Sequence, residues 1–522
     1  MKKQNFKYAY IVCFVLIVVS LPFSKFTLSI SQFLLLITWF VEGNIVSKFK
    51  KFLQNKIAVT VVSLYLLHLI GLIYTSDFDY AFKDLKVKLP LLTFPIIFSS
   101  IEPLEKKWFE RLMYLFIIGV FTSTIISVFV LLGFSKHEIT DIRQISIYTS
   151  HIRLSLMICI SVFSLFYFII NNFKSLRFWL TAFHTIFILW FISFLVLLES
   201  VTGLIIVIIA SLFLVVYYMW KSKKIIYKIY LFTLLVLIPV AICFYLFFQI
   251  KNYYTPYSYK TDVPLKLTKS NNYYFSDIKN NQMENRHYIW RNICWTELEE
   301  TWNKKSKIKF DSIDEKKQSI KYTLVRYLTS KGLTKDAASV NSLSNKDIKN
   351  VEKGIANIEY TKIFSLKPRL YKFLSEYDNY RQTKNPSGYS AIMRFEFWET
   401  SLRIIKKNIL FGVGTGDVNS SFKNEYKKMN TKLAPQWQVR SHNQFLAITV
   451  AFGILGLIWF LFSLFYPLLK LKNFDYFYIT FFLIAFISML AEDTLETQVG
   501  VTFFAFFNSL FLFVKPRYEV EV

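Results

Sequence analysis

The first candidate for chemistry is a polar cluster that runs from Arg440 to Gln444 and has His442 at its centre. It lies where the polar residues 250–440 meet an apolar stretch of membrane-spanning length, and ionisable groups at such a boundary are costly to place and usually functional. A histidine near its ordinary pKa is a common general base at neutral pH. We therefore expect His442 to be a base whose ring is oriented by Asn443 and Gln444, with a purely structural histidine as the alternative.

Arg394 is the candidate for binding an anion. It lies in the stretch 390–407, whose apolar side chains recur every three or four residues, and this spacing predicts a helix with Ser390 as its N-cap. Trp398 stands one turn above Arg394, and an arginine presents a rigid fork of donors to phosphate oxygens. The alternative is an arginine that pairs with a glutamate of the same helix. The predicted core-facing stripe is Ile392, Phe395, Trp398, Leu402 and Ile405.

Three glycines follow in the segment from Phe411 to Asp417, at positions 412, 414 and 416. A dinucleotide-binding fingerprint needs a strand before the glycines and a helix that opens at them. Here a predicted helix comes first, which argues against nucleotide binding. We expect a tight turn that ends the helix and lets the backbone approach another group closely. Substrate is one candidate for that group, which makes Gly414 and Gly416 candidate substrate-binding residues.

A second arginine, Arg153, stands just inside an apolar stretch that begins at His151. Charge at that depth costs a few kcal/mol unless the side chain faces protein or water, so we expect it to point into a polar cavity. Acidic residues at the ends of other apolar stretches predict that this cavity is charged, with snorkelling to the membrane surface as the alternative for any one of them. These residues are Glu199, Glu492, Asp493 and Glu496.

The elements that must position these residues are membrane-spanning helices. Hydrophobic residues make up 54% of the chain, 55 residues are Phe and the mean hydropathy is +0.37, all above the values of a soluble domain. A span needs about 20 apolar residues, and twelve runs come near that length. The sequence therefore predicts an all-α polytopic membrane protein with about twelve spans. The runs lie at 8–23, 27–42, 57–74, 88–100, 109–132, 151–170, 178–198, 201–220, 225–249, 443–467, 474–491 and 498–514.

The distribution of Lys and Arg predicts the orientation, because positive charge near spans is kept on the cytoplasmic side. With twelve spans, twenty Lys and Arg fall on one side and six lie in the short loops of the other. Both termini are then cytoplasmic, and the first run, which no signal-peptide cleavage site follows, is a retained helix. The expected domains are residues 1–249 with spans one to nine, the outer loop 250–440, and residues 441–522 with the last three spans.

The outer loop is expected to fold as a helical cap, since it alternates amphipathic and aromatic-rich stretches and lacks low-complexity runs. Its only cysteine is Cys294, which excludes a disulfide within the loop. The loop holds 35 Lys and Arg against 19 Asp and Glu. Because no nucleic-acid module is visible, an anionic substrate or anionic lipid headgroups are the expected partners of this charge. The expected helices are 285–302, 318–331, 345–356 and 390–407.

The order of these motifs resembles the bacterial O-antigen ligase and O-antigen polymerase superfamily. Each motif is short, but the ordered set is specific and reaches from the sixth span to the C-terminus. Residues 322–336 and the ending Glu492 to Gln498 resemble the Bacteroidetes-type members of the superfamily. The motifs that carry the general resemblance are Arg394 with Trp398, Phe411 to Asp417, Arg440 to Leu446, and Phe452-Gly453 with Gly456.

The resemblance implies a GT-C-like glycosyltransferase of the bacterial inner membrane that works on the periplasmic face. Such an enzyme moves a glycan from undecaprenyl pyrophosphate to an acceptor hydroxyl, with inversion at the sugar and without a metal or other cofactor. In a ligase the acceptor is the lipid A core; in a polymerase, the alternative, it is another lipid-linked repeat. The expected partners are the lipid-linked donor, the lipid or glycan acceptor and the bilayer, and no nucleic acid.

The resemblance also implies roles for individual residues. An essential histidine after the large periplasmic loop matches His442, and essential arginines that bind the pyrophosphate match Arg394 and, as the second one, Arg153. One departure lies at residues 199–203, Glu-Ser-Val-Thr-Gly, where ligases often carry an arginine at the start of a span. The phosphate contacts on the membrane side are therefore less defined. The candidate substrate-binding residues are Arg440, Asn443, Gly414, Gly416 and Trp398.

A transporter that moves lipid-linked glycan without chemistry is the alternative from another class. Such proteins have internal repeats and helices that are interrupted near mid-membrane. The sequence shows neither feature, and its polar residues gather at the outer surface rather than along a path. We therefore expect an enzyme.

Overall fold

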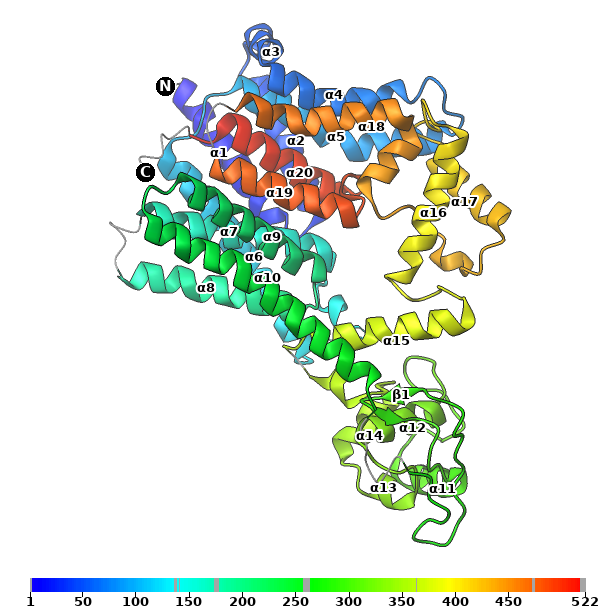
Figure 1. Ribbon diagram of the computed structural model, residues 1–522. Helices are drawn as coiled ribbons and strands as arrows, with labels where there is room; N and C mark the ends of the chain where they lie inside the picture. The colour runs from blue at the N-terminus through cyan, green and yellow to red at the C-terminus, as the bar shows by residue number, and fades with distance from the viewer. Residues whose placement is uncertain are drawn as a thin grey trace. The chain divides into compact units, whose positions relative to one another are not determined.

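The computed structural model describes residues 2–135, 139, 141–172, 178–256, 263–362, 364–471 and 475–516. Almost all regular structure in these ranges is helical, and the one sheet within them is a two-stranded hairpin of β1 (Met283–Glu284) and β2 (His287–Tyr288) (Figure 1). Contacts divide the chain into two compact units. The first consists of residues 1–213 and 376–522, and the second of residues 214–375.

The first unit is a bundle of apolar helices with an aromatic core. Phe14 of α1 (Lys2–Ser20), Phe98 of α5 (Phe78–Ser100) and Phe506 of α20 (Gln498–Ser509) meet edge to face, with ring centroids 4.8 to 6.2 Å apart. The ring quadrupole favours this arrangement. The core therefore joins the first and the last helices of the chain. The other helices of this unit are α2 (Lys25–Val41), α3 (Ile45–Gln54), α4 (Lys56–Ile70), α6 (Lys106–Leu131), α7 (His151–Asn172), α8 (Phe178–Leu197), α16 (Ile392–Lys407), α17 (Val418–Met429), α18 (Gln444–Lys470), α19 (Tyr476–Ala491) and the short η1 (Ile142–Ile145), η4 (Pro435–Trp437), η5 (Thr494–Glu496) and η6 (Leu510–Val514).

Six of the described helices are long and apolar enough to cross a membrane by themselves: α6, α7, α8, α9 (Val201–Lys221), α10 (Ile225–Tyr254) and α18. Helices α2 and α3 pass the same test only as a pair, and they are bent by 110° to one another, so they add a seventh span only if the bent pair is a single span. Each of the twelve predicted apolar runs falls on a helix, some of them shorter. The prediction of a helical polytopic membrane protein is confirmed at this level. The number of spans and the orientation stay predictions, and five of the residues that carried the orientation lie outside the described ranges, namely Lys136, Lys174, Arg177, Lys472 and Arg517.

Helix α18 is broken at Gly453, whose φ of 66° and ψ of −166° are not helical. Such a break leaves backbone groups without helical partners. The segment that follows α16 supplies partners, because backbone hydrogen bonds of 2.8 and 2.9 Å run in both directions between residues 409–414 and residues 450–454. We call this pairing the glycine seam. The sequence does not predict an interrupted helix here, and the seam is what fills the interruption.

The second unit contains α10 and a small helical fold with a core of its own. Leu298, Trp302, Leu324, Tyr327 and Val351 are fully buried in this core. The expectation of helices within the outer loop is confirmed for 318–331 and 345–356. The helices are α11 (Trp295–Lys305), α12 (Ile320–Ser330), α13 (Ala337–Asn341), α14 (Asn345–Glu352) and η3 (Ile358–Thr361), and α15 (Lys367–Thr383) contains the boundary with the first unit.

Two local predictions are wrong. The helix expected at 285–302 begins only at Trp295, because Asn285 and Arg286 have positive φ and form the two-residue turn of the β1–β2 hairpin. Helix α16 begins at Ile392 with Ala391, not Ser390, as its N-cap. The sequence also misses α13, α15 and α17. The predicted domain boundaries at residues 249 and 440 separate membrane spans from an outer loop. The packing of the helices does not test this division, so it stays a prediction.

We expect Gly453→Ala to lower the thermal unfolding midpoint of the protein in detergent. Alanine at positive φ costs about 1 kcal/mol, and here its Cβ would also lie 2.2 Å from the backbone oxygen of Leu410. Gly43→Ala is the matched control, since Gly43 has a φ of 77° but no atom within 4 Å of the added Cβ. Tryptophan fluorescence would follow unfolding. An equal fall in the unfolding midpoint of the two variants would contradict the stabilising role of the glycine seam.

Candidate active site

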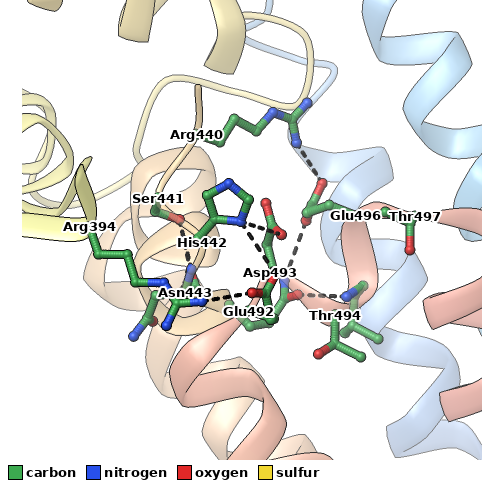
Figure 2. Close-up of polar contacts among 12 residues, drawn as sticks. Arg394, Arg440, Ser441, His442, Asn443, Glu492, Asp493, Thr494, Glu496 and Thr497 are labelled. Carbon is green, nitrogen blue, oxygen red and sulfur yellow. Dashed lines mark hydrogen bonds and ion pairs between the residues drawn. The ribbon is translucent and has the colours of Figure 1, made fainter. Parts of the chain in front are cut away.

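Charged side chains from three parts of the first unit meet near the N-terminal end of α18 (Figure 2). Arg394 comes from α16, and His442 from the residues just before α18. Glu492 and Asp493 come from the segment between α19 and η5. We call these four residues the His442 cluster. The sequence singles out Arg394 and His442 separately, and the structure joins them through Glu492.

His442 contacts two carboxylates through its Nδ1. Its Nδ1 lies 3.3 Å from Oε2 of Glu492 and 3.8 Å from Oδ1 of Asp493. The ring packs against that of Phe397 with centroids 5.5 Å apart, and 38% of the side chain is exposed. Among the described residues Nε2 has no hydrogen-bond partner. This nitrogen is therefore available to take a proton from a substrate.

The backbone at His442 has an unusual conformation. His442 has a φ of 46°, a left-handed conformation that costs about 1 kcal/mol for a residue with a side chain. The next residue, Asn443, caps α18, since its Oδ1 accepts from the amide of Leu446 at 3.0 Å. Its Nδ2 donates to the carbonyl of Leu490 at 2.9 Å. Asn443 thus ties the start of α18 to the end of α19.

The residue that orients the ring is not the predicted one. The side chains of Asn443 and Gln444 form no hydrogen bond with His442 in the described part of the chain, and Gln444 instead binds Glu496 and a backbone amide. Glu492 takes the orienting role. The sequence marks Glu492 only as one of several acids near the ends of apolar runs. It lies 50 residues from His442, so no local pattern could have paired the two.

Arg394 pairs with the same carboxylate. Its Nη2 lies 2.9 Å from Oε1 of Glu492, whose side chain is 7% exposed, whereas that of Arg394 is 33% exposed. An arginine has five N–H donors, and this pair engages one nitrogen of the guanidinium. Among the described residues the remaining donors have no hydrogen-bond partner, so they are available to an anion. Glu492 therefore connects the candidate anion-binding residue to the candidate base.

The surrounding charges raise the pKa of His442. Burial alone would lower this pKa, but the hydrogen bond with Glu492 and the charges of Asp493 and Glu492 outweigh burial and the opposing charge of Arg394. Burial favours the neutral form of Glu492, yet His442, Arg394 and Arg153 bring the pKa of Glu492 below its usual value. Both shifts therefore favour the charged forms of His442 and Glu492 more than in the free side chains.

Arg153 reaches the same segment from α7. Its side chain is nearly buried, and its Nε and Nη2 lie 3.4 and 3.3 Å from the hydroxyl oxygen of Thr497. That oxygen also accepts from the amide of Gly500 and so caps α20. The sequence predicts that Arg153 points into a polar cavity, whereas in the described structure its guanidinium lies against Thr497. The cavity stays a prediction. The charge of Arg153 contributes to the lowered pKa of Glu492, which brings this arginine into the electrostatics of the His442 cluster.

Arg440 belongs to a second ion network, centred on Glu496. Its Nη1 lies 2.7 Å from Glu496, its Nε 2.9 Å from Oδ1 of Asn419, and its guanidinium 5.1 Å from the ring centre of Tyr80. Glu496 also pairs with Lys88 at 3.0 Å, and the side chains of Lys88 and Glu496 are 1% and 11% exposed. Burial favours neutral Glu496, but Lys88 and Arg440 outweigh it and lower the pKa of this acid. We call this set the Glu496 network.

The glycines of the turn after α16 lie close to another segment of the backbone, the connection between α4 and α5. The amide of Gly416 donates to Oγ1 of Thr75 at 2.7 Å, and a Cβ at this position would lie 2.0 Å from the carbonyl oxygen of Asp77. A Cβ at Gly414 would likewise meet the carbonyl oxygen of Gly71 at 3.0 Å. The close approach that the sequence predicts is therefore made to the connection between α4 and α5. Contact of these glycines with substrate stays a prediction.

The buried face of α16 differs from the predicted stripe. Phe395 and Leu402, both predicted to face the core, are 64% and 51% exposed. The helix packs against α17 and α18, and small side chains such as Ser401 permit this. Trp398 contacts Phe395, and its Nε1 is buried without a hydrogen-bond partner among the described residues. The buried side chains are Ile392, Met393, Phe397, Thr400, Ser401 and Ile404.

The His442 cluster also offers three possible metal ligands. The donor atoms of His442, Glu492 and Asp493 lie within 4.8 Å of one another. However, Arg394 already pairs with one of the two carboxylates, and Arg153 adds further positive charge. Such surroundings oppose the binding of a cation. A reaction without a metal stays our prediction.

Residues 357–461 match the family model described as O-antigen ligase. In this segment the chain is similar to the O-antigen ligase family. The match covers about a fifth of the chain and includes both Arg394 and His442. Arg153 and Glu492 lie outside it. No curated protein matches the sequence.

We expect Lys88→Met to destabilise the first unit strongly. The substitution would leave Glu496 and Asp84, whose side chains are 11% and 9% exposed, without their shared cation, and removing one partner of a buried ion pair costs about 3–5 kcal/mol. Lys86→Met, at an exposed position of the same helix, is the matched control and should unfold at the parental temperature. The double variant Lys88→Met/Glu496→Gln should recover part of the loss. If Lys88→Met and Lys86→Met unfold at the same temperature, the Glu496 network does not stabilise the first unit.

Proposed function

We propose that this protein is an inverting glycosyltransferase that transfers a glycan from undecaprenyl pyrophosphate to a hydroxyl of the lipid A core. The observation that carries the proposal is the pairing of His442 with Glu492 beside Arg394. A histidine with one nitrogen oriented by a carboxylate and the other open is suited to deprotonate a hydroxyl. An arginine beside it is suited to bind a phosphate. The family of the matched segment supports the same activity.

In the proposed reaction, Nε2 of His442 takes the proton of the acceptor hydroxyl while the hydroxyl oxygen attacks the anomeric carbon of the glycan. The bond from that carbon to the pyrophosphate oxygen breaks on the opposite face, so the configuration is inverted. Arg394 and Arg153 bind the pyrophosphate and offset the charge that grows on it. Glu492 stabilises the imidazolium that forms. No metal or other cofactor takes part.

The other candidate residues support this machinery. Arg440 holds Glu496, and Asn443 holds the start of α18. Both could also contact the donor from these positions. Trp398 is the proposed sugar contact on α16, because its buried Nε1 lacks a partner among the described residues. Gly414 and Gly416 shape the wall beside the sugar through the turn that they form against the α4–α5 connection.

The proposed setting is the inner membrane, crossed twelve times by a GT-C-like fold with both termini in the cytoplasm. Residues 1–249 and 441–522 form the membrane part in this proposal, and residues 250–440 form the periplasmic loop. The apolar helices α1, α4, α19 and α20, shorter than the six long ones, support the higher count. The proposal places the His442 cluster at the periplasmic surface, where a lipid-linked donor presents its pyrophosphate.

A transporter without chemistry fits these observations less well. The broken helix α18 is a feature of transporters, but here the chain's own residues 409–414 fill the break. An open path for a substrate would instead leave these backbone groups to solvent or ligand. A histidine that is oriented by a carboxylate and lies beside an arginine is also suited to proton transfer rather than to the passage of a substrate across the membrane.

We expect His442→Ala to abolish transfer in the intact, membrane-inserted protein. General base catalysis contributes about a hundredfold to ten-thousandfold, so the rate should fall by at least the lower figure while the thermal midpoint stays near the parental value. The assay incubates purified protein with a lipid-linked glycan and a core lipid and follows the product on a gel. His287→Ala, a histidine of the second unit, is the control. A parental rate in the His442→Ala variant would refute the assignment of the base.

The same variant separates ligase from polymerase when it replaces the parental gene. Accumulation of full-length lipid-linked polymer with loss of long glycan from the surface lipopolysaccharide indicates a ligase. Core lipid that carries single repeats indicates a polymerase. Unchanged glycan in cells that lack the protein altogether would count against both activities.

We expect the transfer rate to rise with pH through the pKa of His442, which lies above its ordinary value. The base must be neutral to accept a proton, so activity is low below this pKa and full above it. Glu492→Gln removes a charge that raises the pKa, so the acidic limb of the rate profile should move to lower pH. The maximal rate should fall, because the imidazolium loses its stabilising charge. An acidic limb that does not move would show that Glu492 does not act on His442.

A further inference from the structure

A basic hollow lies at the end of α18 opposite to His442. Its volume is about 470 Å³. Three helices border it, namely the end of α3, the start of α4 and the end of α18. The His442 cluster stands where α18 begins and the hollow where α18 ends, so the two lie toward opposite faces of a membrane that α18 crosses. The lining residues are Lys51, Gln54, Asn55, Lys56, Ile57, Tyr466 and Lys470.

The three lysines of the hollow have no carboxylate partner among the described residues. In the described ranges no acidic group lies within ion-pair distance of Lys51, Lys56 or Lys470, and the nearest interaction of Lys470 is with the ring of Tyr466, 5.7 Å away. By contrast Lys48, on the same helix as Lys51, pairs with Glu42 at 2.6 Å. Like charges around one hollow repel each other. An anion in the hollow would relieve that repulsion.

The depth of the hollow in the membrane follows from α3. This helix turns by 110° from α2, and its side chain Phe52 is buried against Ala58 and Val62 of α4. Val46 and Leu53 on α3 are 85% and 55% exposed. A short basic helix with exposed apolar side chains is typical of a helix that lies in the membrane interface. The hollow beside it is then at the level of the lipid headgroups.

We propose that the hollow binds the phosphate of an anionic phospholipid from the adjacent leaflet, with Lys51, Lys56 and Lys470 as the charged ligands. Basic pockets between membrane helices take such headgroups. The Oδ1 of Asn55 already caps α4, where it accepts from the amide of Ala58 at 3.2 Å. Its side-chain amide nitrogen has no partner among the described residues and can donate to a headgroup oxygen. In the orientation proposed above this leaflet is the cytoplasmic one, and the site is independent of the transferase activity.

The test measures binding of phosphatidylglycerol to the full-length protein in neutral detergent by native mass spectrometry. The triple variant Lys51→Gln/Lys56→Gln/Lys470→Gln should bind this lipid on the order of a hundredfold more weakly, since each lysine near an anionic headgroup contributes roughly a fivefold factor. The matched control Lys50→Gln/Lys107→Gln/Lys223→Gln removes the same charge from exposed positions outside the hollow. It should bind as the parental protein does, and phosphatidylcholine should bind weakly to all three.

Three results would overturn the proposal. Equal binding by the triple variant and the parental protein would show that the hollow is not the site. Equal losses in the triple and control variants would show that diffuse surface charge attracts the lipid. Displacement of the lipid by millimolar inorganic phosphate would show that a free anion, rather than a lipid, is the occupant. If the triple variant does not fold, the single variants Lys470→Gln and Lys50→Gln are compared in the same way, since each removes one charge. Binding of the lipid by Lys470→Gln with the parental affinity would then overturn the proposal.

Discussion

Two carboxylates that are largely shielded from solvent, Glu492 and Glu496, constrain the rest of the first unit. A buried carboxylate costs several kcal/mol unless cations and donors surround it, so other elements must bring positive charge to each. Glu496 is met by Lys88 of α5 and by Arg440, and Glu492 by Arg394 of α16 and by the candidate base. Both acids lie on the short segment between α19 and α20. Their pairing therefore fixes α5, α16 and the start of α18 relative to one another.

The same pairing imposes a compromise on the proposed chemistry. Glu492 favours the protonated form of His442, which reduces the fraction of neutral base at neutral pH. It also stabilises the imidazolium as the proton arrives, which lowers the barrier to transfer. Arg394 acts in the opposite direction on the same pKa. Binding of a pyrophosphate would offset the charge of Arg394 and so make His442 a stronger base when the donor is present.

The parts of the structure that follow from local pattern could be predicted, and those that depend on distant pairing could not. Apolar runs became helices because a helix satisfies its backbone groups within the segment, and His442 stood out through its place at a boundary. Glu492 did not stand out, since several acids near span ends share its local pattern. The predicted face of α16 is wrong because apolarity marks Phe395 and Leu402, whereas small side chains such as Ser401 permit close helix contact.

The break at Gly453 gives the His442 cluster a second, independent support. The half of α18 before the break follows directly from His442, and it pairs through the glycine seam with residues 409–414, which continue the chain from α16 and Arg394. Arg394 and His442 are thus connected by charge through Glu492 and by backbone through the seam. An anion that binds Arg394 can weaken the charge pair, but the seam cannot open without exposing unpaired amides and carbonyls. This arrangement allows the guanidinium to exchange a carboxylate for a phosphate while the base keeps its place.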